Sequence, residues 1–437
     1  MEGPNCSTSV HSFPALELPG GPLLSTLFAL FIVAYLFLLL ARLCDHYFVS
    51  CIKITSYNLG ISSDVAGATL MAVAVSLPDL FMNCVATFVT EGDIGVGTVV
   101  GVSLFNMLAV PAAFVLLQPS NMIVIDYWSL TRDAIFFGIS LVCLTLTLLD
   151  NRVEWYESLV FIVIYAVYIM VLCCNKSLRN KIESYLDTYR RSKNISMEEW
   201  PLIRKSQSIL SYNLEEDLLR DYSKLYDDDY LSRVEACLKK VGQILCAPID
   251  LLLYLTLPNP QTRIGPSRWY PLTFVLCLLW IAAISYTVAW MITFAGYELQ
   301  ISDSLVGLTF IAIGLGVPEA ASSVIVARQG HGSMALSNSL GASTFDILIC
   351  LGLPWVLKSA YFSDYPHEVY INSRGIGYSA ILLGVSLIFL YTCLAFNRFN
   401  LSKRMGAVFL VTYLLFASIT ALLETDIIFK GNLSLCP

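Results

Sequence analysis

Charged residues are scarce in this sequence, and their scarcity sets the class of protein. Asp, Glu, Lys and Arg together make up 14% of the 437 residues, whereas hydrophobic residues make up 57%. Soluble globular proteins carry about 25% charged residues. The composition therefore indicates an integral membrane protein whose surroundings are a lipid bilayer. The net charge of −7 leaves no basic surplus, so no nucleic-acid partner is expected.

Histidine is also rare, which bears on enzymes and cofactors. The four histidines are scattered, and no CxxC pair or HExxH sequence occurs, so a zinc or redox centre has little support. No nucleophile–base pair or nucleotide-binding loop is visible either. We therefore expect neither an enzymatic activity nor a cofactor. The start, Met1-Glu2-Gly3, lacks the basic region of a signal peptide, so none is expected.

Long apolar runs dominate what the sequence does contain. Windows of about twenty apolar residues predict ten membrane-spanning helices, five in each half of the chain. A polar stretch lies between the halves, followed by a short apolar run, residues 241–258, that Pro248 interrupts. We interpret this run as an interfacial or re-entrant helix. The ten predicted spans are residues 22–42, 62–89, 96–117, 130–149, 155–174, 270–294, 303–328, 334–357, 375–396 and 405–424.

Lysine and arginine gather in the loops on one side of this map, which places the central loop in the cytosol and both termini outside. Asn5 and Asn432 begin glycosylation sequons on the two external tails. Cys6 and Cys436 lie on the same side, where a disulfide is permitted. Spacing alone leaves a bridge and two free thiols equally open. The chain then divides into an external tail, a first repeat, a cytosolic loop with the interfacial helix, a second repeat and an external tail, at residues 1–21, 22–174, 175–269, 270–424 and 425–437.

The two halves of the chain repeat each other. Residues 67–79, shifted by 240 positions, align without a gap on residues 307–319. Five spans separate equivalent segments, and an odd number means that the repeats enter the membrane from opposite faces. The predicted fold is an all-α integral membrane protein with ten transmembrane helices in two inverted-topology five-helix repeats. The equivalent pairs include Thr69 and Thr309, Pro78 and Pro318, Asp79 and Glu319, Ser103 and Ser343, and Asn106 and Asp346.

In each repeat a proline interrupts an apolar segment and a carboxylate follows at once, as Asp79 or Glu319. Because proline has no N–H, the carbonyls of Ala74 and Gly314 lose their helical partners. A carboxylate at mid-membrane costs about 2.5 to 3.5 kcal/mol, and free carbonyls persist there only when they are buried in protein or line a cavity. The structural alternative is two kinked helices whose acids are hydrogen-bonded to neighbours. This alternative requires the same proline–carboxylate pair to have arisen independently in both repeats. The pattern therefore predicts a mid-membrane cation site in a transporter.

Motifs along nearly the whole chain resemble the cation/calcium exchanger superfamily, and most closely its potassium-dependent sodium/calcium exchangers. The resemblance implies a protein that extrudes calcium against sodium entry by alternating access and binds calcium, sodium and potassium between two repeats. The motifs that carry it are Asp64-Val-Ala-Gly-Ala-Thr69, Glu91-Gly-Asp-Ile-Gly-Val-Gly97, Val326-Ala-Arg-Gln-Gly330, Phe345-Asp-Ile-Leu348 with Gly352-Leu-Pro-Trp355, and Ile371-Asn-Ser-Arg-Gly375.

The resemblance also implies roles for single residues. Carried over by position, Asp79 and Glu319 would be the calcium-binding carboxylates, and Asp346 would be the acid linked to potassium dependence. Relatives place a cysteine near each end beside a sequon, which favours the bridge between the two tail cysteines. The other expected oxygen ligands are Asn106, Ser76, Ser343, Thr69 and Thr309.

The sequence departs from the family pattern at neutral ligands, since relatives carry hydroxyls at the positions of Val75, Val102, Leu315, Gly316 and Ala342. Sodium depends on such oxygens more than calcium does, so sodium coupling is the property most affected. The leading hypothesis is a calcium-for-sodium antiporter of the plasma membrane or a secretory-pathway membrane, with potassium co-transport left open. The alternatives are an exchanger coupled to potassium or protons, its sodium sites lost, and a transport-inactive membrane subunit.

Overall fold

The computed structural model describes residues 13–14, 21–48, 50–51, 54, 76–90, 93–117, 122–149, 152–174, 245–258, 261–262, 265–266, 270–299, 301, 303–328, 332–362, 368–370 and 375–424. Contacts divide the chain into two units, one of residues 1–173 with 257–437 and one of residues 174–256. In the second unit the described residues include one apolar helix, Leu245–Thr256, which is shorter than a membrane span. Its location at the membrane interface stays a prediction.

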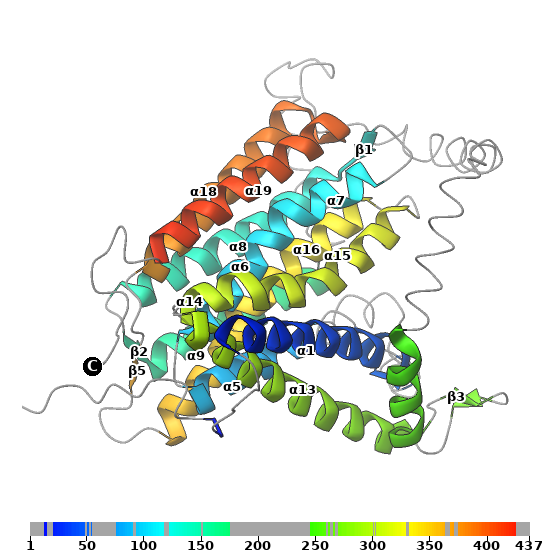
Figure 1. Cartoon of the computed structure of the whole chain (residues 1–437). Helices are drawn as coiled ribbons and strands as arrows, with labels where there is room; N and C mark the ends of the chain where they lie inside the picture. The colour runs from blue at the N-terminus through cyan, green and yellow to red at the C-terminus, as the bar shows by residue number, and fades with distance from the viewer. Residues whose placement is uncertain are drawn as a thin grey trace, which may run out of the picture. The chain divides into compact units, whose positions relative to one another are not determined.

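Helices make up most of the first half of the larger unit (Figure 1). Several long helices contain a π-helical turn, labelled η, and short strands lie in the loops. In chain order these elements are α1 (Pro22–Leu43), η2 (Cys44–Phe48), α5 (Leu77–Val85), η4 (Ala86–Thr90), α6 (Ile94–Leu104), η5 (Phe105–Ala109), α7 (Val110–Leu116), β1 (Met122–Val124), α8 (Tyr127–Leu148), β2 (Arg152–Glu154) and α9 (Trp155–Cys173).

The second half contains the same kinds of element. Its first helix, α13, packs side by side with α1 (Figure 1). In chain order the elements are β3 (Gln261–Thr262), β4 (Gly265–Pro266), α13 (Tyr270–Leu299), α14 (Asp303–Val306), η6 (Gly307–Ile311), α15 (Ala312–Arg328), α16 (Gly332–Phe345), η7 (Asp346–Leu351), α17 (Gly352–Leu357), η8 (Lys358–Phe362), β5 (Glu368–Tyr370), α18 (Gly375–Phe396), β6 (Asn400–Ser402) and α19 (Lys403–Glu424).

The described residues form nine helices that are long and apolar enough to cross a membrane. Nine of the ten predicted spans correspond to them. The remaining span, predicted at 62–89, is described only from residue 76 onward, where Leu77–Thr90 form a shorter apolar helix. The all-α membrane fold is therefore confirmed, whereas the count of ten helices stays a prediction.

Short strand pairs tie the loops together in a symmetric way. Strand β1, in the loop before α8, pairs antiparallel with β6, in the loop before α19. Strand β2, in the loop after α8, pairs antiparallel with β5, in the loop before α18. The two pairs therefore lie at opposite ends of α8 (Figure 1). Each pair joins the loop before the fourth helix of one repeat to the loop after the fourth helix of the other, as inverted repeats require.

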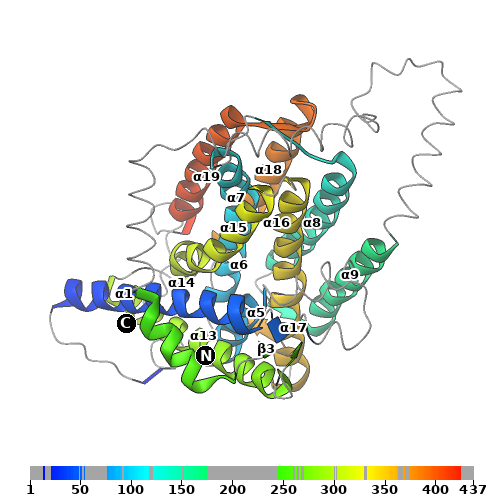
Figure 2. The same cartoon turned by 90° about the vertical axis from the view of Figure 1, so that its right-hand side faces the viewer.

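The helix that runs through α6, η5 and α7 lies at the centre of this unit. In the most apolar 18-residue stretch of Ile94–Leu116, 83% of the residues are buried, whereas the corresponding values for Trp155–Cys173 and Lys403–Leu423 are 17%. Figure 2 accordingly shows α6 between other helices, and α9 and α19 at the outside. Since lipid-facing helices need no polar contacts, the polar side chains of a transport site are expected on the central helices.

Candidate cation site

A hydrogen bond between the two repeats marks the centre of the site. Asn106 lies in η5 and is fully buried, and its Nδ2 donates to Oε2 of Glu319 on α15. Glu319 is 5% exposed and follows Pro318, which lies inside α15. The proline cannot donate to the carbonyl of Gly314, which agrees with the sequence argument for this repeat. The bond joins residues that are 213 positions apart.

Asp79 occupies the corresponding place in the first repeat, but its proline has another role. Helix α5 begins at Leu77, so that Pro78 lies in the first turn, where a missing N–H costs little. The described helix is therefore started by Pro78, whereas Pro318 interrupts a helix. Asp79 is 3% exposed and lies in the same first turn, where the helix dipole favours a negative charge.

Asp346 is the first residue of η7 and is fully buried. Its Oδ1 lies 3.7 Å from Sγ of Cys350, and its Oδ2 has no hydrogen-bond partner among the described residues. Asn106 and Asp346, which the repeat register pairs, both lie in π-helical turns, η5 and η7. A π turn widens the helix and often occurs at functional sites. Prolines follow both turns, at 111 and 354, and relief of their ring clash is a physical reason for the wider turns.

The three acids lie close enough to act on one another. Asp79 interacts electrostatically with Glu319, and Asp346 interacts with both. All three are buried, so their mutual repulsion is screened less than it would be in water. When all three are ionised, positive charge is needed to offset the repulsion, and transported cations would supply it.

The other predicted ligands are placed as follows. Ser76 precedes α5 and is buried, and within the described part of the chain its Oγ has no hydrogen-bond partner. Oγ of Ser343 and Oγ1 of Thr309 donate to carbonyls one turn back in their own helices, at 3.2 and 2.7 Å. Both hydroxyls keep lone pairs for a cation. Thr69, Asn5, Asn432, Cys6 and Cys436 lie outside the described residues, so the predictions that concern them remain open.

The structure also shows polar groups that the sequence reasoning missed. Asn83 lies one turn after Asp79, and Ser323 lies one turn after Glu319. Both are buried, and Asn83 Oδ1 and Ser323 Oγ lack a hydrogen-bond partner within the described ranges. Ser103 Oγ is in the same situation. A shift of 240 positions pairs Asn83 with Ser323, so the repeat register already contained the signal.

Glycines allow the central helices of the two repeats to touch. A Cβ added at Gly97 would lie 2.4 Å from the carbonyl oxygen of Ser304, and one at Gly101 would lie 2.4 Å from that of Leu308. From the other side, a Cβ added at Gly307 would lie 2.4 Å from the carbonyl oxygen of Ile94. Gly97 and Gly101 are four residues apart and so share one face of α6, which is the small-residue pattern of close membrane helix packing.

Aromatic packing accounts for one missing hydroxyl. A Cβ added at Gly316 would lie 2.5 Å from the ring of Phe105, and one at Gly314 would lie 2.1 Å from the ring of Phe37. A serine at 316 would therefore require Phe105 to move. The glycine is thus part of a packed interface, which leaves no room for a hydroxyl-bearing side chain at this position.

A second buried acid, Asp133 on α8, contrasts with these groups. It is fully buried, and its oxygens accept hydrogen bonds from Arg132 Nε at 2.8 Å and Nη2 at 3.1 Å. Tyr168 on α9 donates at 3.2 Å, and Ser337 on α16 also donates. Four donors and one countercharge satisfy this carboxylate. Its position therefore indicates a structural role in joining α8, α9 and α16, whereas Oδ2 of Asp346 has no such donor among the described residues.

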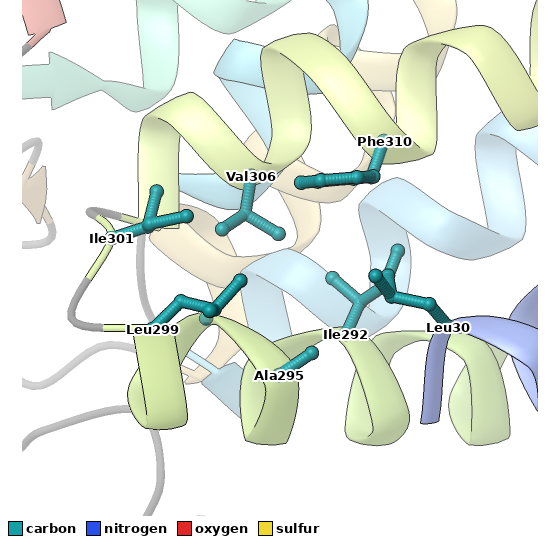
Figure 3. Close-up of a pocket in the computed structure, with 8 residues that line it drawn as sticks. Leu30, Ile292, Ala295, Leu299, Ile301, Val306 and Phe310 are labelled. Carbon is teal, nitrogen blue, oxygen red and sulfur yellow. The ribbon is translucent and has the colours of Figure 1, made fainter. Parts of the chain in front are cut away.

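A small pocket in the larger unit is too apolar to hold an ion. It lies between α1, α13, α14 and η6, and Figure 3 shows apolar side chains turned into it from these elements. A cation that entered this pocket would lose its hydration shell, and no oxygen donors would replace the lost water. The residues that line it are Leu30, Ile292, Ala295, Gly296, Leu299, Ile301, Val306 and Phe310.

The donors of the site are mixed. Among the described residues, no group of three or more His, Cys, Asp or Glu side chains is arranged to hold a metal ion. Calcium takes six to eight oxygen ligands, many of them neutral. Amide, hydroxyl and carbonyl oxygens would therefore have to complete the shell of a cation at these acids.

Comparisons with known proteins show what the chain is similar to. The family model for sodium/calcium exchanger protein matches residues 27–174 and 269–422. Human sodium/potassium/calcium exchanger 5 is 34% identical over 429 residues, covering 93% of this chain and 85% of that protein. Human sodium/potassium/calcium exchanger 4 is 29% identical over 553 residues, covering 99% and 87%. The crystal structure of the H⁺/Ca²⁺ exchanger CAX shares the fold, with a TM-score of 0.52 and 12% identity over 94% of this chain and 88% of that one.

Proposed function

The chain belongs to the sodium/calcium exchanger family, and we propose on this basis that it is a secondary active antiporter that exchanges calcium for sodium. The observation that carries the proposal is the hydrogen bond from Asn106 to Glu319, because it joins the two repeats beside two further buried acids. Inverted repeats that meet at a polar site can expose that site to either face by rocking against each other. Alternating access follows from this symmetry.

Charge balance suggests what the site carries. Asp79, Glu319 and Asp346 together bring three negative charges when ionised. One calcium and one monovalent cation bring three positive charges and neutralise them. In a buried site an uncompensated charge is expensive, so the neutral combination is the favoured one. The relatives whose names include potassium support the same assignment.

The repeat symmetry indicates where the monovalent cation binds. Asn106 and Glu319 correspond, through the register, to Asp346 and Asp79. In the first pair an amide N–H bridges to a carboxylate. In the second pair two carboxylates interact, and neither has a hydrogen to donate when ionised. We therefore assign potassium to the neighbourhood of Asp346, where a cation takes the place of the amide hydrogen.

The same residues bear on the two alternatives, a transport-inactive subunit and an exchanger without sodium coupling. A transport-inactive subunit would gain nothing from an Asp346 oxygen that is buried and lacks a hydrogen-bond partner in the described structure. An exchanger without sodium coupling is the alternative that the missing hydroxyls suggest. Gly316 stands at one of these positions, where an added Cβ would meet the ring of Phe105. Among the residues that the structure describes, no specific contact favours protons or potassium as the driving ion over sodium.

Calcium flux in proteoliposomes is the deciding experiment. Sodium, potassium and pH gradients are imposed one at a time, and radioactive calcium uptake is measured. We expect an outward-directed sodium gradient to drive uptake, and Asp79→Ala or Glu319→Ala to abolish it at normal protein levels. Glu298→Gln, a change at a half-buried acid near the end of α13, is the matched control and should transport normally. Uptake that ignores the sodium gradient but follows the pH gradient would contradict the proposal.

The protein is a multi-pass membrane protein. We further propose that both termini face away from the cytosol, that no cofactor takes part and that the chain has no enzymatic activity. Glycans at Asn5 and Asn432 would support the orientation. Their absence from both tails, in protein from a glycosylating cell, would count against it.

A further inference from the structure

One thiol lies among the oxygens of the proposed ion site. Cys350 is in η7, one turn after Asp346, and is fully buried. Its Sγ lies 3.7 Å from Oδ1 of Asp346 and 3.7 Å from the backbone oxygen of Ser76. Ser76 belongs to the other repeat, 274 positions away. The thiol therefore lies at the meeting point of the two repeats.

The two residues that contact this thiol carry further oxygens of their own. Asp346 Oδ2 and Ser76 Oγ are both buried, and neither has a hydrogen-bond partner in the described part of the chain. Buried polar atoms of native proteins are nearly always paired, so an unpaired carboxylate oxygen calls for a ligand. A buried cysteine that only fills space behaves as a small hydrophobe and has no need of such neighbours.

We infer that Cys350 makes this site selective for thiophilic divalent cations, with Cd²⁺ as the example. The inference rests on the proposed function, because it concerns the same transport site. Calcium is a hard ion that takes oxygen ligands, whereas thiolate ligands select softer metals. Cd²⁺ has the charge of calcium and a similar size. It would bind Sγ of Cys350, an oxygen of Asp346 and the carbonyl of Ser76, while the thiol proton passes to water.

Cd²⁺ bound by these donors would inhibit calcium transport. A cation held between Asp346 and Ser76 contacts both repeats at once. The site is balanced by calcium together with a monovalent cation at Asp346, and Cd²⁺ bound at Asp346 displaces that monovalent cation. Cd²⁺ therefore inhibits calcium uptake, and it does so more strongly than a hard ion of equal charge.

The test compares a soft and a hard competitor. Calcium uptake into proteoliposomes is titrated with Cd²⁺ and separately with Sr²⁺, in wild type, Cys350→Ser and Cys277→Ser. Cys277 is equally buried but lies on α13. In Cys350→Ser the Cd²⁺ concentration for half-inhibition should rise at least about tenfold, since even outer-shell changes cost 10- to 100-fold in metal affinity. The Sr²⁺ curve should not move, and Cys277→Ser should follow wild type with both ions.

A binding measurement keeps this inference separate from the proposed function. Cd²⁺ is titrated into the purified protein in detergent, and thiolate–cadmium bonds are counted by ultraviolet absorption. Wild type and Cys277→Ser should each bind one more tight Cd²⁺ than Cys350→Ser or Cys350→Ala. Equal binding by all four proteins would overturn the inference whether or not they transport calcium. No calcium uptake by wild type, together with the extra Cd²⁺, would reject the proposed function alone.

Discussion

Replacing Gly101 by alanine tests whether the two repeats are held together by close backbone contact. The added Cβ would lie 2.4 Å from the carbonyl oxygen of Leu308 and 2.6 Å from Cβ of Ala312, where ordinary contacts measure 3.4–4 Å. Neither atom can rotate away, because one is backbone and the other is attached directly to it. Helix α6 must therefore separate from η6 and α15 by about 1 Å, the difference between these distances and an ordinary contact.

The expected cost follows from two opposing effects. Overpacking of a well-packed interior costs about 1–3 kcal/mol, whereas replacing glycine by alanine inside a helix gains about 1 kcal/mol. The net loss of stability in Gly101→Ala is then up to about 2 kcal/mol. Gly384→Ala on α18 is the matched control, because no described atom lies within 4 Å of its added Cβ. This control should be stabilised by the propensity gain alone.

Thermal unfolding in detergent, followed by fluorescence-detected size-exclusion chromatography, separates the two variants. The melting temperature should fall in Gly101→Ala and rise or stay level in Gly384→Ala. Calcium uptake should fall in the first variant as well, because Asn106 lies little more than one turn beyond the contact. If both variants melt at the same temperature, the close helix crossing does not hold the repeats together and the reasoning fails.

Three further outcomes are expected. Asp133→Ala should lower the free energy of unfolding by about 3–5 kcal/mol, because it leaves the Arg132 guanidinium without its buried partner; an unchanged melting temperature would show that the pair is not structural. Asp346→Asn should remove potassium dependence but retain calcium uptake, measured while external potassium is titrated, and an unaltered potassium response would refute the assignment. A nonreducing gel of protein cut in the central loop should keep the halves joined through Cys6 and Cys436 until reductant is added.

Much of the site could be predicted because the chain contains the same information twice. The register that pairs Asp79 with Glu319 and Asn106 with Asp346 needed no structure. The structure brings Asn106 and Glu319 into contact and places the three acids within electrostatic reach. A carboxylate beside a proline in an apolar segment is costly. Its presence in both repeats therefore predicted that the two acids belong to one site.

The local shape of each helix could not be predicted in the same way. The register treats Pro78 and Pro318 as equivalent, yet one starts a helix and the other lies inside one. The same ring chemistry is compatible with both, since proline is tolerated in a first turn and kinks a helix interior. The π turns that contain Asn106 and Asp346 likewise depend on packing between helices, which a single sequence does not reveal.

Contacts across long sequence separations were missed for a related reason. Nothing near Cys350 in the sequence shows that Ser76 lies beside it, and Asp133 gave no sign of Tyr168 or Ser337. A buried cysteine in an apolar run reads as a hydrophobe until its neighbours are known. The distinction between Asp133, whose oxygens are satisfied, and Asp346, whose Oδ2 lacks a partner among the described residues, also needs coordinates.

The two repeats supply the same scaffold but different chemistry, and the difference falls on one helix. In the first repeat, η5 and the start of α7 present an amide at Asn106 and a hydrocarbon at Val110. At the equivalent positions of the second repeat, η7 presents a carboxylate at Asp346 and a thiol at Cys350. All four residues are fully buried, so burial does not distinguish them. Since only the second pair adds charge and a soft donor, we expect discrimination among cations to depend on η7, whereas Asn106 in η5 holds Glu319 by its hydrogen bond.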